Sequence, residues 1–262
     1  MTALRAPLRF FESQLVAYRR TWRGTVISSF LNPILFLTAM GLGVGSLVDD
    51  GAGDLEISYL AFVATGLMAA NAMQNGAGEG MWPVRAGIKW RKNFHGAITT
   101  PIEPGDIIVG RAMWTLLRLT VVQTVFAVIA VLFGALELGP ALLAVPPAAL
   151  TGVAFMAALT AFTVTRETDE SLANMFRFVI LPMFLFSGTF FPISQLPGFL
   201  ELIAYATPLF HGVELVRKIA LPDIDPSVVS SMPLWIHLAY LVAMTVLGIY
   251  FGSKYLSRKL RP

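Results

Sequence analysis

Residues 233–253, PLWIHLAYLVAMTVLGIYFGS, contain no aspartate, glutamate, lysine or arginine over 21 positions. An α-helix rises 1.5 Å per residue, so about 20 apolar residues cross the roughly 30 Å hydrocarbon core of a bilayer. A surface helix of a soluble protein would carry charged residues along one face. The stretch therefore predicts a transmembrane helix.

Five other stretches reach a similar length and apolar character. They comprise the residues of about 25–48, 58–80, 108–134, 141–165 and 175–193. The composition agrees, because 56% of the residues are hydrophobic and only 13% are charged, about half the charged share of a soluble domain. We therefore expect an all-α integral membrane protein with six transmembrane helices, in one membrane domain over about 25–254.

Basic residues are distributed unevenly among the segments that connect these helices. Sixteen of the 19 lysines and arginines lie in alternate segments, which are 1–24, 81–111, 166–177 and the tail from residue 254. The intervening segments hold two, and Arg118 lies inside the third predicted helix. Because basic residues gather on the cytoplasmic side, both termini are predicted to be cytoplasmic, with 255–262 as a basic tail.

The first segment, 1–24, has apolar residues at helical spacing. They are Leu4, Leu8, Phe11, Leu15, Tyr18 and Trp22. This narrow stripe predicts a cytoplasmic amphipathic helix in the plane of the membrane interface, with Phe11, Tyr18 and Trp22 toward the lipid. Such a helix either anchors the chain or offers a docking surface to a cytoplasmic partner, and the sequence leaves both open.

Two connecting segments are longer than a simple connection requires. In 81–107, aromatic residues alternate with basic ones, and we expect a short helix from Val84 to Ile98. Because two membrane spans flank this segment, a partner protein or lipid headgroups fit it better than nucleic acid. In 194–232, the stretches 198–206 and 209–220 are apolar but too short to span, which predicts a re-entrant or interfacial helix pair.

Several polar side chains lie inside the predicted membrane helices, where they need a partner or a role. Arg118 reaches the cytoplasmic headgroups, pairs with Glu79, near the end of the preceding helix, or takes part in gating or substrate contact. A polar ridge follows the second helix at helical spacing; it consists of Asn71, Gln74, Asn75 and Gly78. This ridge has to face protein or a transport pathway rather than lipid, and the sequence allows either subunit packing or pathway lining.

The sequence contains no catalytic motif that we recognise. The phosphate-binding pattern G-x-x-x-x-G-K-[ST] and the H-E-x-x-H zinc motif are absent, as is cysteine. His95, His211 and His237 lack the spacing of a metal site, so we expect no catalytic residue, metal or cofactor in this chain. Two alternatives to a transporter are an intramembrane lipid- or glycan-modifying enzyme that would use Arg118 and His211, and a non-transporting membrane assembly factor.

Four stretches resemble the ABC-2 type permeases, the membrane subunits of a class of ATP-binding cassette (ABC) exporters. They are RRTWRGTVISSFLNPILFLTAMGLG (19–43), ITTPIEPGDIIVG (98–110), FSGTFFPISQLP (186–197) and ATPLFHGVELVR (206–217). They occur in the order of the family, and the six-helix plan fits the rest of the chain. The sequence is most similar to the branch of nodulation lipo-oligosaccharide and daunorubicin-type drug exporters.

The resemblance implies a multi-pass permease of the cytoplasmic (inner) membrane that pairs with a second copy, as a homodimer, among membrane lipids. It also implies two copies of a separate ABC ATPase, which bind ATP and Mg²⁺ in place of this chain. In the family a coupling helix between spans two and three meets the ATPase, which would give Trp90, Phe94 and Thr100 that role. The turn 166–171, with Glu167, would form a smaller contact, and no nucleic acid is expected.

The function implied is export of an amphiphilic substrate, either a lipid-linked oligosaccharide or a hydrophobic drug, with a polysaccharide as a further candidate. ATP-driven closure of the ATPases would push on the N-terminal helix and on 85–101 and rock the two six-span bundles. Helices within 195–220 would shape the outer exit. Asn71, Gln74, Asn75 and Arg118 would then serve the pathway or the packing around it.

Overall fold

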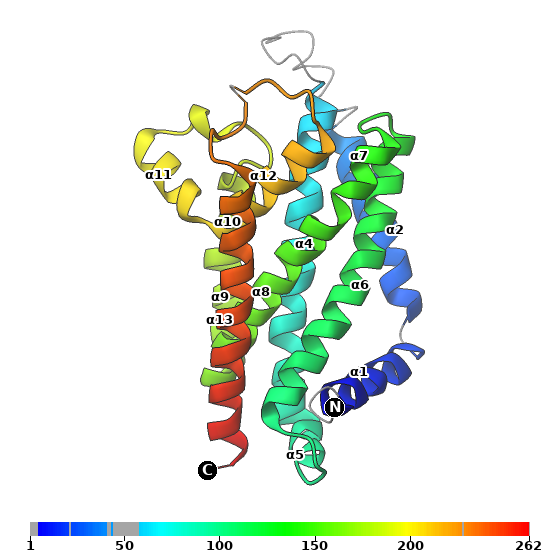
Figure 1. Cartoon of the computed structure of the whole chain (residues 1–262), viewed down its shortest axis with the longest axis vertical. Coiled ribbons are helices and arrows are strands. Elements are labelled where there is room, and N and C mark those ends of the chain that lie inside the picture. The colour runs from blue at the N-terminus through cyan, green and yellow to red at the C-terminus, as the bar shows by residue number, and fades with distance from the viewer. Residues whose placement is uncertain (1–4, 21, 41–42, 44–57, 227, 262) are drawn as a thin grey trace.

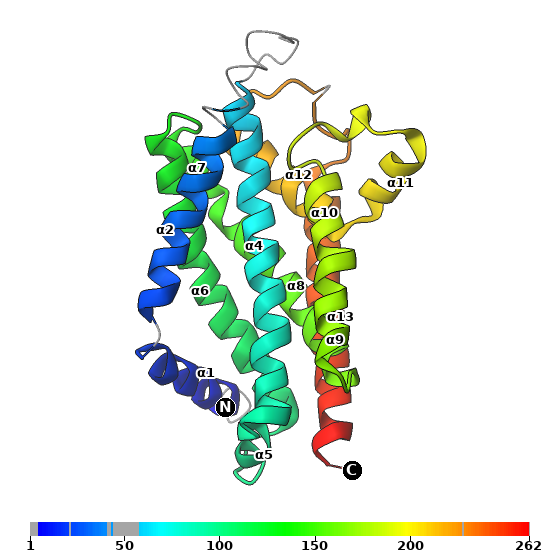
Figure 2. The same ribbon diagram turned by 180° about the vertical axis from the view of Figure 1, so that it is seen from behind.

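Every regular element in the described part of the chain is a helix, and long helices run along the longest axis of the molecule (Figures 1 and 2). The computed structural model describes residues 5–20, 22–40, 43, 58–226 and 228–261. Apart from Gly43, the end of the first predicted span and the acidic segment after it, 41–57, lie outside the described residues. The all-α prediction is confirmed for the part that is described.

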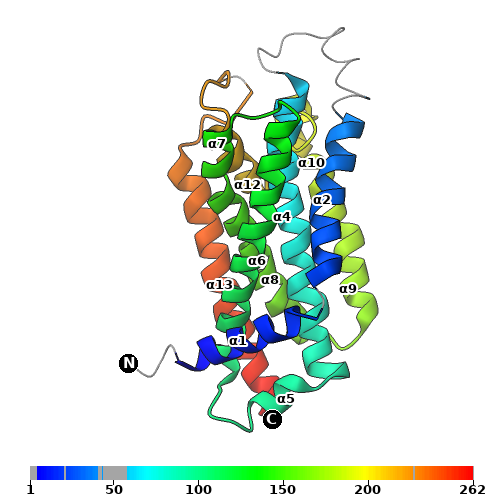
Figure 3. The same ribbon diagram turned by 90° about the vertical axis from the view of Figure 1, so that its right-hand side faces the viewer.

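Helix α1 (Arg5–Tyr18) lies across the bundle, whereas α2 (Trp22–Thr38) follows its long axis (Figure 3). An N-terminal helix is therefore present, but the predicted extent of its stripe is wrong at one end. The chain turns at Arg19 and Arg20, so that Trp22 begins α2 instead of continuing α1.

Four of the described helices form most of the bundle. They are α4 (Tyr59–Arg85), α6 (Pro104–Leu132), α8 (Val145–Thr165) and α13 (Leu234–Leu260). The basic residues Arg258 and Lys259 of the predicted tail lie in the last turn of α13, which continues as a helix to Leu260. The short helix α7 (Leu138–Leu143) leads into α8.

The two ends of the bundle differ in what they carry (Figure 1). The α5 end, which is lower in Figure 1, holds α1, the last turn of α13 and α5 (Asn93–Ala97). The α11 end, opposite, holds α7 together with α11 (Gly198–Ala206) and part of α12 (Pro208–Ala220). The predicted helix pair in 194–232 is confirmed as two helices, and most residues of α12 are buried against other helices.

Three helical runs in the described residues are long and apolar enough to cross a membrane; these are Pro104–Leu132, Leu138–Thr165 and Leu234–Leu260. A fourth is obtained if α11 and α12, which are bent by 81° at their junction, count as one broken span. Helix α4 has 27 residues, but its polar ridge and Glu79 lower its hydropathy, and α2 has only 17 residues. Length and composition of the described helices thus account for three or four spans, not six.

The fifth predicted span, 175–193, is wrong at its end. The helical run there has three consecutive parts: α9 (Asp169–Met175), a π-helical turn (Phe176–Ile180) and α10 (Leu181–Phe186). Beyond it Gly188 has a φ of 82°, a conformation that glycine adopts readily and other residues do not. The chain turns there, so the helix stops at Phe186.

The single helix predicted from Val84 to Ile98 is also wrong, because the segment is divided. Helix α4 runs directly into a π-helical turn (Ala86–Trp90), and α5 begins only at Asn93. Between them Lys92 has a φ of 52°, in the left-handed region, which L-residues enter singly and which ends a helix. The segment is therefore an extension of α4 followed by a separate short helix.

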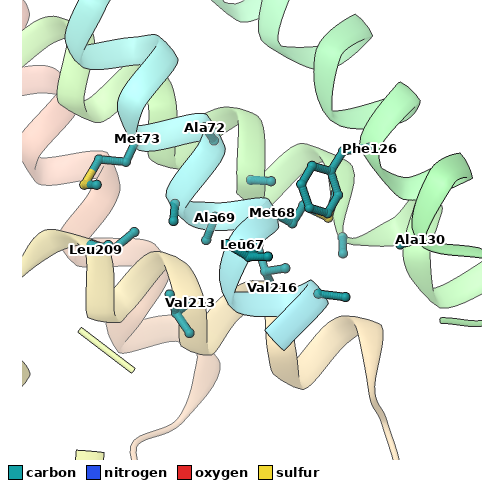
Figure 4. Close-up of a cluster of buried hydrophobic side chains, with 14 of the residues drawn as sticks. Leu67, Met68, Ala69, Ala72, Met73, Phe126, Ala130, Leu209, Val213 and Val216 are labelled. Atoms are coloured by element: carbon teal, nitrogen blue, oxygen red, sulfur yellow. The ribbon is translucent and has the colours of Figure 1, made fainter. Parts of the chain in front are cut away.

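The core lies around α4, which packs most extensively against α8. Figure 4 shows apolar side chains of α4, α6 and α12 that meet there, including Leu67, Met68, Phe126, Leu209 and Val213. Where α4 and α8 cross, Gly76 faces Gly152, and a Cβ on Gly76 would lie 2.8 Å from the Cα of Gly152. Small residues allow helix backbones to approach closely, which is how helices associate in membranes.

Candidate functional site

The α5 end exposes an aromatic side chain among basic ones. Trp90, the last residue of the π-helical turn, is 54% exposed. Lys89, Arg91 and Lys92 beside it are exposed as well, and residues 81–102 include no acidic residue. An exposed aromatic ring within a polar rim is the arrangement that protein–protein interfaces use for binding hot spots.

Phe94 and Thr100, the other residues of this segment that were predicted to meet a partner, differ in exposure. Thr100 is exposed, and its hydroxyl donates to the carbonyl oxygen of Ala97 at 2.6 Å. Phe94 is only 1% exposed. A Cβ on Gly87 would lie 2.6 Å from Cζ of its ring, and the ring of Phe10 lies 6.0 Å away, centroid to centroid. Phe94 therefore holds α5 against α1 and the π-helical turn, and its ring is not part of the exposed surface.

The turn between α8 and α9 is fastened to the end of α4 by the buried Arg85. Its Nε donates to Oδ1 of Asp169 at 2.5 Å and its Nη1 to the carbonyl oxygen of Arg166 at 2.8 Å. Its Nη2 donates to the carbonyl oxygen of Glu167. An arginine with a carboxylate and two main-chain acceptors fixes the backbone of a turn, so the predicted contact turn is held by a residue more than 80 positions earlier.

Glu167 is exposed on this turn and forms an ion pair with α13. Its carboxylate accepts a hydrogen bond from Nζ of Lys259 at 2.7 Å, and Lys259 also donates to the carbonyl oxygen of Val164 at 3.0 Å. The hydrogen bond and the charge of Lys259 lower the pKa of Glu167 below its ordinary value. An exposed pair adds little stability, but it places the end of α13 beside the turn.

Two arginines of α6 share one carboxylate of α4. Arg111 donates through Nη2 to the main-chain oxygen of Glu79 at 2.6 Å and to its Oε2 at 3.2 Å. Arg118 donates to Oε1 of the same carboxylate. Of the alternatives for Arg118, pairing with Glu79 is confirmed, and Arg111, which we expected in a connecting segment, joins the pair. The cluster carries one positive charge in excess, and the Nε of each arginine is buried without an acceptor.

The polar ridge of α4 is partly engaged with α6. Nε2 of Gln123 donates to Oδ1 of Asn71 at 3.1 Å, and Nδ2 of Asn75 donates to the main-chain oxygen of Asn71 at 2.9 Å. Gln74 and Asn71 both line a small cavity between α2, α4, α6 and α10. The structure thus brings Asn71, Asn75 and Gln123 together, and Asn71 also borders the cavity beside Gln74.

Helix α1 packs on the bundle by a face that the apolar stripe did not identify. Pro7 and Phe10 are its buried residues, whereas Phe11 is only partly buried. Near the end of α1, the ring of Tyr18 packs on that of Trp114 in α6, with centroids 5.0 Å apart. The stripe residue Tyr18 thus contacts α6, whereas the two most buried residues, Pro7 and Phe10, lie beside the stripe rather than on it.

Two buried polar groups near the α11 end were not predicted. Arg217, which we had placed in a connecting segment, is buried in α12 and donates to the main-chain oxygens of Phe62 at 3.2 Å and Gly188 at 2.8 Å. The Nδ1 atoms of His211 and His237 lie 2.9 Å apart. Both groups join residues distant in sequence, so periodicity and spacing carry no signal for them.

The comparison with known families decides the class of this protein. The family model described as "ABC-2 type transporter" matches residues 9–221. The chain belongs to the ABC-2 type transporter family. The match begins within α1 and ends directly after α12, so it includes α5, the Glu79 cluster and the buried Arg217.

Curated relatives of this ABC-2 type protein carry transport and nodulation names. Nodulation protein J of Rhizobium meliloti (strain 1021) is 27% identical over 247 residues, which cover 94% of this chain and 91% of the relative. Nodulation protein J of Bradyrhizobium diazoefficiens is 28% identical over 206 residues, or 79% of this chain and 78% of the relative. The inner membrane transport permease YadH of Escherichia coli K12 is 22% identical over 207 residues, 79% of each chain.

Family membership and the apolar helices together establish where the protein is located and which class of protein it is. It is a multi-pass protein of the inner membrane and a transport permease subunit, not itself an enzyme. The resemblance found in the sequence is thereby confirmed at the level of the family.

Proposed function

We propose that this chain is the permease subunit of an ABC exporter, powered by a separate ATPase that binds ATP and Mg²⁺. The observation that carries the proposal is the surface at the α5 end, where Trp90 is exposed among basic residues. The neighbouring turn is held rigid by Arg85. Such a surface suits a soluble partner, and the name of one relative, a transport permease, supports the assignment to transport.

In the proposed complex two permeases, as a homodimer, pair with two ATPase subunits, and an amphiphilic substrate moves outward between the bundles. The substrate is a lipid-linked oligosaccharide or a hydrophobic drug. ATP-driven closure of the ATPases displaces the α5 end. Because Arg85 joins α4 to the turn and Lys259 joins α13 to it, the displacement is shared by three helices.

Replacing Trp90 with alanine is expected to weaken ATPase binding at least tenfold while leaving the permease folded. The ring is largely exposed, so its removal costs the fold little, whereas truncation of an interface hot spot costs about 2 kcal/mol or more of binding energy. To measure this, each ABC ATPase of the same organism is tagged and mixed with the purified permease. The amount of ATPase that stays bound and its rate of ATP hydrolysis are then compared between Trp90→Ala and the unchanged permease.

The matched control is Trp235→Ala, because Trp235 is 67% exposed at the start of α13, at the opposite end of the bundle. It should retain the ATPase as the unchanged permease does. Equal retention by both variants would contradict the assignment of the docking surface. A permease that retains no ATPase at all would contradict the proposed function itself.

We further propose six spans, formed by α2, α4, α6, α7–α8, α9–α10 and α13, with both termini in the cytoplasm. In support, α1 and the last turn of α13 lie at the same end of the bundle (Figure 1), as an even number of crossings requires. That end also exposes the basic residues around Trp90, in keeping with the positive-inside rule.

The chain has no cysteine, so single cysteines give a topology measurement without background. An impermeant maleimide is expected to label Glu137→Cys and Asp223→Cys in intact cells. It should label Thr100→Cys and Glu170→Cys only after the membrane is permeabilised. All four positions are exposed. Labelling of Thr100→Cys in intact cells would contradict the proposed orientation.

A further inference from the structure

A pocket opens between α1, α2 and α6. It begins at the level at which α1 crosses the bundle and extends along α6 away from the α5 end. Its walls are almost entirely apolar and include Leu15 of α1, Phe30 of α2 and Val121 of α6. Tyr18 and Trp114, whose rings pack together, lie at the α1 side of the pocket. Paired aromatic rings beside an interfacial helix are typical of the headgroup level of a membrane.

The pocket has the depth of one membrane leaflet. Along α6 its lining extends from Trp114 to Val125, which at 1.5 Å per residue corresponds to about 16 Å. Half of the roughly 30 Å hydrocarbon core is about 15 Å. An acyl chain that starts at the level of α1 would therefore fill the pocket.

The same pocket contains a positive charge that the protein does not balance. Arg118 lines it and keeps 19% of its side chain accessible. The carboxylate of Glu79 is shared with Arg111, so two guanidinium groups face one negative charge. Helical side chains lean toward the helix N-terminus, which for Arg118 is the direction of α1. The exposed Arg20 lies in the turn after α1, and the exposed Arg23 lies in the first turn of α2.

We propose that this pocket binds one anionic lipid, with its acyl chain against α6 and its phosphate near Arg118 and the α1–α2 turn. Excess positive charge beside an apolar wall is costly in a low-dielectric setting unless an anion balances it. A neutral lipid would fill the apolar part but leave the charge, and a free phosphate would meet the charge but leave the apolar part empty. Only an amphiphile with a negative head satisfies both.

Native mass spectrometry of the full chain in a mild detergent tests the proposal. We expect one dioleoyl-phosphatidylglycerol to bind at least tenfold more tightly than dioleoyl-phosphatidylcholine, and inorganic phosphate alone to give no adduct. Val121→Trp fills the pocket and leaves the charges of Glu79, Arg111 and Arg118 in the chain, and it should lower the affinity for phosphatidylglycerol at least tenfold. Arg118→Gln should remove the preference over phosphatidylcholine.

The matched control is Val246→Trp on α13, because Val246 and Val121 are both 58% exposed. It should bind phosphatidylglycerol as the unchanged chain does. Equal binding by the two tryptophan variants, or equal affinity for both lipids, would overturn the proposal. A loss of dimer in Val121→Trp with unchanged lipid binding would assign the pocket to a second copy of the chain instead. No ATPase is needed, so these outcomes are independent of the proposed function.

Discussion

Replacing Gly76 with alanine is expected to lower the free energy of unfolding by about 3 kcal/mol or more, the upper range for overpacking a core. A Cβ at this position would meet the backbone of Gly152, with the Cα of Gly152 only 2.8 Å away. Main-chain atoms cannot rotate aside as side chains do, so α4 and α8 would have to separate. Thermal unfolding of the detergent-purified protein, followed by size-exclusion chromatography, measures the loss.

Gly78→Ala provides the control on the same helix, two residues away. A Cβ on Gly78 would meet no atom within 4 Å, so the same substitution should leave stability unchanged or raise it slightly, because alanine favours the helix by about 1 kcal/mol over glycine. If both variants unfold at the same temperature, close approach of α4 and α8 is not what Gly76 provides.

Replacing Glu79 with glutamine is expected to cost about 3–5 kcal/mol of stability, as removal of one partner from a buried ion pair generally does. The substitution leaves the guanidinium groups of Arg111 and Arg118 facing each other with no negative charge between them. Both the yield of folded protein and its unfolding temperature should fall, and these are the quantities to measure.

Two further variants separate charge balance from other effects. Glu12→Gln removes the partner of Arg9 in an exposed pair on α1, and such pairs contribute about 0–1 kcal/mol, so little change is expected. The double variant Glu79→Gln with Arg118→Gln restores the excess charge of the cluster to one and should recover part of the stability. A double variant less stable than Glu79→Gln alone would contradict charge balance as the cause.

The sequence predicted those features that depend on periodicity and composition. Apolar runs located the long helices, and helical spacing located α1 and the polar ridge of α4. The pairing of Arg118 with Glu79 was also one of the stated alternatives, because an arginine inside a span needs a partner or a role. These inferences depend on residues that are close in sequence or on the energetic cost of burying a charge, and both can be judged from one amino-acid sequence.

Features that join distant residues could not be predicted in the same way. Arg85 and Arg217 both looked like charges of connecting segments, and only the folded chain shows them buried against main-chain oxygens. From the sequence, Phe94 was predicted to belong to an exposed aromatic cluster. In the structure its ring is buried, because Gly87 has no side chain and leaves room for it. Helix ends were misplaced where local geometry overrides hydrophobicity, as at Lys92 and Gly188.

The π-helical turn that ends at Trp90 affects the direction in which the Trp90 side chain points. In it the N–H of Arg91 donates to the carbonyl oxygen of Ala86 at 2.7 Å, five residues back rather than four. One additional residue in a turn rotates everything beyond it by about 100°, since a full α-helical turn takes 3.6 residues. The direction in which the Trp90 ring points around the helix axis therefore depends on the number of residues in this turn, and not only on the presence of a tryptophan.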